Sequence, residues 1–167
     1  MEATEQSVNS AGTAGVIARP PLLFLAALLL GFILVHLLPL VFPISRASPA
    51  HWVSATIAAF MMLGGVTLAL AAIRNFTEAA TPVPTNQPTR TLVTSGLHGW
   101  TRNPIYVGIL LVYLGIGLVV RSPWIMLLAV PLAIIIHYGV IAREEAYLEE
   151  RFGDAYRDYK TRVRRWL

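Results

Sequence analysis

The stretch GLVVRSPWIM (Gly117–Met126) decides the fold, because it holds the short break between two long apolar runs. The runs are Pro104–Val120 and Pro123–Ile141, and only Arg121 and Ser122 separate them. A serine followed by a proline is typical of a helix start, with the serine as N-cap and the proline at the first helical position. So short a link forces the two helices into an antiparallel hairpin. We therefore expect TRNPIY (residues 101–106) and AREEAYLEE (residues 142–150) to be neighbours in space.

The composition places the chain among membrane proteins. Of its 167 residues, 56% are hydrophobic and only 13% are charged, and the mean hydropathy is +0.62. A soluble domain of this size is less apolar and carries more charge. Two further apolar runs, Pro21–Phe42 and Trp52–Ile73, precede the hairpin. At ~1.5 Å per residue each of the four runs can cross ~30 Å of hydrocarbon, Pro104–Val120 only just. The predicted fold is an all-α polytopic membrane bundle of four transmembrane helices.

Several kinds of chemistry are excluded by residue usage. The chain contains no cysteine, which rules out disulfides, thiolate catalysis and cysteine-ligated metals. Its four histidines have no ligand-like spacing, so we expect no metal site. Any cofactor is then expected to be organic.

The basic residues set the expected orientation. With four spans, the N-terminus, the loop of residues 74–103 and the C-terminal tail share one side of the membrane. That side carries all of the 13 basic residues except Arg46 and Arg121. The positive-inside rule therefore places both termini and the long loop in the cytoplasm.

The chain divides into three expected parts. Residues 1–18 are small and polar and predict a disordered tail, and residues 19–74 hold two scaffold helices. Residues 75–167 form the expected core: a structured cytosolic loop, the hairpin and a C-terminal amphipathic helix interrupted at Gly153. The apolar positions of that helix recur every three or four residues. They predict either packing on the bundle or, with Arg162, Arg164, Arg165 and Trp166, an anchor among lipid headgroups.

Both ends of the hairpin bring chemically useful groups to one place. Glu144 and Glu145 follow closely on an apolar run. They can be interpreted either as an ordinary solvated helix end or as part of a binding site. Carboxylates at the negative end of a helix dipole are disfavoured, so the pair calls for a cation. The set would suit a zwitterionic cofactor with an adenine ring. Its other expected members are the cations Arg90, Arg102 and Arg143 and the aromatic side chains Trp100, Tyr106 and Tyr147.

Two blocks in this order carry a resemblance to a known family. LVTSGLHGWTRNPIYVG (residues 92–108), followed after the hairpin by REEAYLEERFGDAYRDYKTRVRRW (residues 143–166), resembles the integral-membrane methyltransferases of the isoprenylcysteine carboxyl methyltransferase and phospholipid methyltransferase group. The resemblance covers Arg90 to Trp166. It implies S-adenosylmethionine as the cofactor, bound in a cytosolic pocket under the loop and the tail.

The same resemblance assigns site residues by position. The implied catalytic or substrate-orienting residues are Arg143 and Glu145. Asn103 and His98 depart from the family pattern, which often has histidine and tyrosine there, so a proton-transfer role at Asn103 would be lost. The implied cofactor contacts are Arg90, Thr91, Leu92, Val93, His98, Asn103, Pro104, Ile105, Tyr106 and Glu144.

The expected function is methyl transfer from S-adenosylmethionine to a lipophilic acceptor in a bacterial inner membrane. The acceptor would be an isoprenylcysteine-type carboxylate or a lipid, and the expected partners are this small or lipidated molecule and membrane lipids, without nucleic acid. Two alternatives stay open at this point. One is an NADPH-dependent reductase of the sterol type, and the other is a non-enzymatic membrane subunit.

Overall fold

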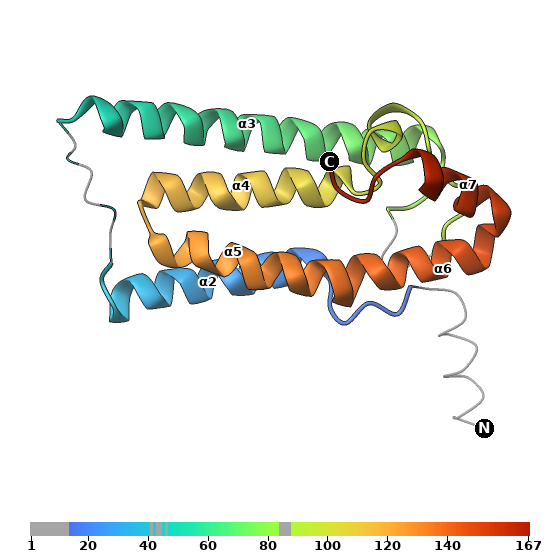
Figure 1. The fold of residues 1–167 in the computed structure, drawn as a ribbon, viewed down its shortest axis with the longest axis horizontal. Helices are drawn as coiled ribbons and strands as arrows, with labels where there is room; N and C mark the ends of the chain where they lie inside the picture. The colour runs from blue at the N-terminus through green and yellow to red at the C-terminus, as the bar shows by residue number, and fades with distance from the viewer. Residues whose placement is uncertain (1–13, 41, 43–44, 46, 84–87) are drawn as a thin grey trace, which may run out of the picture.

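The computed structural model describes residues 14–40, 42, 45, 47–83 and 88–167, and in them it shows helices and no strand. Helices α3, α4 and α5 lie side by side along the long axis, with α2 against α5 (Figure 1). The elements are α2 (Pro20–Leu37), α3 (Pro49–Glu78), the 3₁₀ turn η1 (Gly96–Gly99), α4 (Pro104–Val120), α5 (Pro123–Ile135), the π-helical η2 (Ile136–Ile141), α6 (Ala142–Phe152) and α7 (Asp154–Arg162).

In the part of the chain that the structure describes, three helical segments are long and apolar enough to cross a membrane, namely Pro20–Leu37, Pro49–Glu78 and Pro123–Phe152. The chain is thus a helical membrane protein. The fourth predicted span, α4, begins and ends where the sequence predicted, but with 17 residues it is shorter than the other three.

Two boundaries differ from prediction for identifiable reasons. Helix α2 ends at Leu37, because Pro39 forces its neighbour Leu38 out of the helical conformation, at φ −130° and ψ 75°. Helix α3 continues past the apolar run to Glu78, where an exposed ion pair of 2.7 Å joins Arg74 to Glu78. Hydrophobicity alone marks the membrane-facing part of a helix and not its polar last turns.

The two-residue hairpin link is present as predicted. Arg121 adopts the left-handed conformation at φ 56°, and the Ser122 hydroxyl accepts a hydrogen bond of 3.2 Å from the backbone N–H of Ile125. Ser122 is fully buried, so this N-cap satisfies its hydroxyl as well as the helix end. Helices α4 and α5 therefore run antiparallel, and the far end of the hairpin carries the candidate site.

Helix α4 packs most extensively on α3, and glycines make this possible. A Cβ atom on Gly65 would lie 2.5 Å from the carbonyl oxygen of Gly108, and one on Gly108 would lie 2.6 Å from that of Gly65. Small residues at such a crossing let two membrane helices approach closely. The α3–α4 contact holds the start of α4 beside the end of α3.

The second helix of the hairpin changes pitch before it reaches the site. It continues from α5 through the π-helical turn η2 into α6. A π turn takes up an extra residue and so rotates the following helix by ~100° relative to an unbroken α-helix. The face that α6 presents to α4 therefore depends on η2.

The C-terminal helix is broken at Gly153, as predicted. Gly153 has φ 54°, and the chain turns there from α6 into α7. Lys160 closes this turn with an ion pair of 2.8 Å to Glu149. Tyr156 and Tyr159 are buried on the inner face of α7 and pack with Val163 against residues of the loop and α6.

Of the predicted disordered tail of residues 1–18, the first 13 lie outside the described residues. The remainder runs along η2, where the backbone N–H of Ile17 donates to the carbonyl of Gly139 at 3.2 Å. Helix α2 then begins at Pro20, which places Pro20 and Pro21 next to the candidate site.

We predict that Gly65→Ala lowers the thermal stability of the detergent-solubilised protein, by ~1–3 kcal/mol, because the new methyl group meets backbone of α4 that must shift. The matched control is Gly64→Ala, whose methyl group would meet no atom within 4 Å. Thermal unfolding of both variants checks this. Equal midpoints for the two would show that the α3–α4 crossing does not limit stability.

Candidate functional site

A buried hydrogen bond joins the start of α4 to α6. The hydroxyl of Tyr106 donates to Oε1 of Glu144 at 2.9 Å, and both side chains are buried. Tyr106 lies within the first turn of α4, which begins at Pro104. The predicted proximity of the two hairpin ends is thus realised as a direct side-chain contact.

A buried ion-pair cluster lies beside that hydrogen bond. Arg102 donates to Oε1 of Glu145 through Nε at 3.2 Å and Nη2 at 2.8 Å. Arg165 donates to both oxygens of the same carboxylate, from Nε to Oε1 at 2.9 Å and from Nη2 to Oε2 at 2.5 Å. Buried charges are tolerated only when paired and hydrogen-bonded, and two arginines on one glutamate meet that condition.

The loop between α3 and α4 is held down at several points. The hydroxyl of Tyr147 accepts a bond of 3.1 Å from the N–H of Thr89, and the Thr81 hydroxyl accepts one of 2.9 Å from the N–H of Arg90. Further along, the ring of His98 packs edge-on against Phe76 with 4.8 Å between centroids. The expected structured loop is therefore present where the chain is described; residues 84–87 lie outside that part.

The C-terminal tail closes over the loop. Tyr159 donates its hydroxyl proton to the carbonyl oxygen of His98 at 2.6 Å. Burial raises the pKa of Tyr159 to about 12, so this hydroxyl stays protonated and remains a donor. Beyond α7, Arg164 forms a parallel bridge with Thr101, and its carbonyl accepts from the N–H of Arg102 at 2.9 Å.

These elements enclose a cavity of about 250 Å³. Its volume is close to the lower end of the ~300–1,000 Å³ typical of small-molecule sites. Polar groups gather where α4, α6, the loop and α7 meet, and apolar side chains of α2, α3 and α4 line the rest. The lining residues with polar side chains, tyrosines included, are Thr89, Thr91, His98, Arg102, Asn103, Tyr106, Glu144, Glu145, Tyr156 and Tyr159.

Two lining residues have buried polar atoms without a partner in the described chain. They are the hydroxyl oxygen of Thr89 and Nδ1 of His98. An unpaired buried polar atom costs ~1–3 kcal/mol, so each calls for a hydrogen-bonding group from elsewhere. Together with the unshared lone pairs of Glu144, they fit a polar organic ligand that both donates and accepts. No cluster of metal-binding side chains is present among the residues that the structure describes.

Most of the sequence-predicted site residues line the cavity. The exceptions are two arginines. Arg90 is exposed on the loop, and its backbone N–H, not its guanidinium, is bonded to Thr81. The residues that line the cavity are Thr91, Leu92, Val93, His98, Asn103, Pro104, Ile105, Tyr106, Glu144 and Glu145.

Arg143 points away from the cavity. Its Nη1 donates to the carbonyl oxygen of Gly15 at 2.8 Å, on the outer face of the bundle. Successive residues of a helix differ by ~100° in direction, so Arg143 lies ~200° from Glu145 and away from the face that Glu144 and Glu145 share. A role for its guanidinium in orienting substrate has no support in this geometry.

Two expected aromatic members of the site do not line the cavity, and of the two interpretations of the C-terminal helix, packing on the bundle holds for Arg165 and Trp166. Trp100 is 84% exposed and does not line the cavity. Tyr147 does not line it either, but its hydroxyl accepts the hydrogen bond from the N–H of Thr89 and so holds the loop in place. Arg165 does not reach out to lipid headgroups, because its guanidinium is bound to Glu145. Trp166 packs against the core cluster of the bundle.

Sequence reasoning did not assign several cavity residues to the site. Helical spacing predicts Tyr156 and Tyr159 only as part of the apolar face of an amphipathic helix, although their hydroxyl groups distinguish them from the other positions of that face. Thr89 and Phe76 lacked any signal in the sequence, because only the folding of the loop against α3 brings them to the cavity.

Comparison with known proteins gives two matches. The sequence model of a family described as phospholipid methyltransferase matches residues 53–155, from α3 to the start of α7. An uncharacterized protein of Haemophilus influenzae is 43% identical over 63 residues, which are 38% of this chain and 100% of that protein.

The buried imidazole of His98 gives the loop a predicted pH dependence. Burial lowers the pKa of His98 from 6.5 to about 4. Between these values the unfolded chain binds a proton that the folded chain excludes, so this histidine makes stability fall as the pH drops from about 6.5 to 4. We expect His98→Phe, which keeps the ring against Phe76, to lose less thermal stability than the native protein over this range. Parallel melting curves for the two at each pH would contradict this.

Proposed function

Because the chain belongs to the phospholipid methyltransferase family, whose sequence model covers well over half of it, we propose that it transfers a methyl group from S-adenosylmethionine to a lipophilic acceptor in the membrane. The observation that carries the proposal is the cavity where both hairpin ends, the loop and the tail meet. Its polar end combines a carboxylate pair with two unpaired buried polar atoms.

The residues present fit the cofactor. Glu144, whose one hydrogen-bond partner in the described part of the chain is Tyr106, would receive the cofactor's ammonium group. Thr89 and His98 would bond its polar edges, and the rings of Tyr156 and Tyr159 offer aromatic faces for the adenine. The rest of the cofactor wall would come from Thr91, Leu92, Val93, Asn103, Pro104 and Ile105.

The acceptor would approach from the lipid side. The apolar part of the cavity is lined by Pro20 and Pro21 of α2, Ile73 of α3 and Ile109 of α4. These residues belong to helix segments that face lipid in the proposed arrangement. We infer that the apolar acceptor reaches the site sideways between helices, while the cofactor enters from the cytoplasm.

The chain's own contribution is positional. When bound, S-adenosylmethionine supplies a methyl group that is already activated by the sulfonium. The protein has to align the acceptor with that methyl group and to exclude water. Of the two residues assigned to this task from the sequence, Glu145 lines the cavity and is held in one orientation by two arginines. We assign the orienting role to Glu145 alone.

We further propose that α4 is the fourth transmembrane helix. Its 17 residues correspond to ~26 Å, close to the hydrocarbon thickness, and α3 and α5 cover it on two sides. The loop, α7 and the start of α2 then lie at one end of the bundle (Figure 1), which the positive-inside rule assigns to the cytoplasm of a bacterial inner membrane. The exposed basic side chains Arg157, Arg162 and Arg164 of the amphipathic C-terminal region would face the headgroups.

Calorimetric titration with S-adenosylhomocysteine tests the cofactor assignment. We expect the native protein to bind it and both Glu144→Gln and Tyr106→Phe to weaken binding by ~10-fold or more. The glutamine cannot carry the negative charge that would pair with the cofactor's ammonium group, and the phenylalanine lacks the hydroxyl that holds Glu144 in place.

The matched controls for this experiment lie outside the cavity. Glu150→Gln removes an exposed carboxylate of α6, and Tyr113→Phe removes a hydroxyl in the middle of α4. Both should bind as the native protein does. Binding of NADPH instead of S-adenosylhomocysteine, or native affinity in both cavity variants, would refute the assignment.

A further inference from the structure

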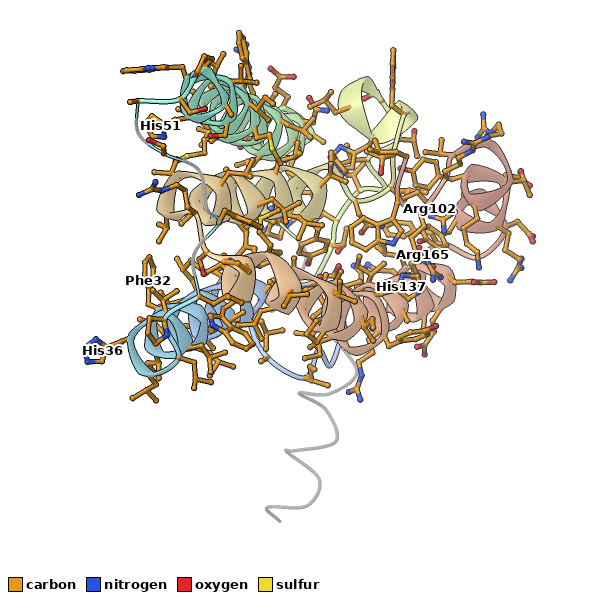
Figure 2. All side chains as sticks on the ribbon, turned by 60° about the vertical axis from the view of Figure 1, so that its left-hand side comes forward. Phe32, His36, His51, Arg102, His137 and Arg165 are labelled. Carbon is orange, nitrogen blue, oxygen red and sulfur yellow. The ribbon has the colours of Figure 1, made fainter. Side chains whose placement is uncertain are left out.

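The segment after α7, Val163–Leu167, is here called the strap. It runs back from α7 to the start of α4, where Arg164 bridges Thr101, and it continues to Trp166, which packs against the core cluster of the bundle. Its central residue, Arg165, contacts three different elements through its guanidinium and its carbonyl. Figure 2 shows Arg102, Arg165 and His137 close together at the end of the molecule opposite His36 and His51.

The guanidinium of Arg165 fixes the carboxylate of Glu145. Nε and Nη2 bind the two different oxygens, at 2.9 Å to Oε1 and 2.5 Å to Oε2. Arg102 binds Oε1 only. A two-point contact sets the plane of a carboxylate, which a single-point contact does not. Arg165 therefore determines how Oε2 of Glu145 is presented at the cavity.

The carbonyl oxygen of Arg165 fixes a second side chain of the cavity. It accepts a hydrogen bond of 2.9 Å from Nδ2 of Asn103 and one of 3.2 Å from the hydroxyl of Thr101. The nitrogen and oxygen of an amide side chain can exchange places by a 180° rotation, and this hydrogen bond fixes Nδ2 of Asn103 on the side of the strap. With Nδ2 held by the strap, Oδ1 of Asn103 has no partner in the described chain and remains as an acceptor.

The strap is anchored on its far side by His137 of η2. Nη1 of Arg165 lies 2.7 Å from Nε2 of this ring, and Nε1 of Trp166 lies 3.0 Å from Nδ1. Arginine and tryptophan can only donate, and a neutral imidazole accepts at one nitrogen, so only one of these contacts is a hydrogen bond in either tautomer. The two contacts with Glu145 are therefore the firmer attachment of Arg165.

We propose that Arg165 is a positioning residue of the site: through Glu145 and Asn103 it orients the hydrogen-bond acceptors that a bound cofactor or substrate meets. The inference rests on the proposed function, since it concerns the same cavity. No residue of the strap lines the cavity, but Glu145 and Asn103 do. The strap would therefore act on the cavity by orienting these two side chains.

A mutant cycle on ligand affinity tests the proposal. S-adenosylhomocysteine binding is measured by calorimetry for the native protein, Arg165→Gln, Arg165→Lys, Glu145→Gln and the double variant with both glutamines. We expect Arg165→Gln to weaken binding at least tenfold and Arg165→Lys to restore part of it, because lysine keeps the charge but not the two-point contact. The double variant should bind no more weakly than the weaker single variant, since both changes act through one contact.

The matched control is Arg164→Gln. The side chain of Arg164 is exposed on the same strap, and its carbonyl contact with Arg102 survives the change. It should bind like the native protein, and thermal melting without ligand should show each variant folded.

Each outcome has one meaning. Native affinity in Arg165→Gln, or in Arg165→Lys if the glutamine variant does not fold, would overturn the positioning role while leaving the proposed function intact. So would losses that simply multiply in the double variant, which is the result expected of a merely structural residue. Failure of the native protein to bind S-adenosylhomocysteine would overturn both proposals.

Discussion

The ion pair between Arg102 and Glu145 is the constraint on which the site depends. The pair sits at the far end of the hairpin that Arg121 and Ser122 open, and both side chains are nearly excluded from solvent, at 10% and 8% exposure. A charge buried to this degree is stable only with a complete set of partners. Arg102 finds further partners in the carbonyls of Lys160 and Val163, so the pair ties the start of α4 to α6 and to the end of α7 at once.

This arrangement explains why the cavity lies at one end of the bundle. Along the apolar part of the hairpin the helices pack closely, and the glycines of the α3–α4 crossing leave little space. Polar side chains at the end that carries the cavity cannot pack in this way, because each needs a hydrogen-bonding partner. The loop and α7 supply most of those partners and close a space between them, and the atoms left unpaired, on Thr89 and His98, mark where a ligand would complete the set.

Much of this could be predicted from the sequence. The hairpin followed from the two-residue link, and the limits of α4 followed from Pro104 and from the length of its apolar run. The neighbourhood of Tyr106 and Glu144 followed from the hairpin, and the break at Gly153 from the glycine itself. Local rules sufficed in these cases, because turn length, proline and glycine act on their immediate neighbours and need no tertiary context.

What the sequence alone determined is therefore the set of helices, their pairing and the end of the bundle that carries the chemistry. Which residues at that end face inward was decided by the tertiary structure. The π-helical turn η2 sets the rotation of α6, and with it the inward position of Glu144 and Glu145 and the outward position of Arg143. The partners of Arg165 could not be predicted from the sequence either. A basic residue in an amphipathic tail has the same local pattern whether it contacts a headgroup or a buried glutamate. The physical reason is that direction and burial of a charge depend on contacts between residues far apart in the chain, which periodicity does not encode.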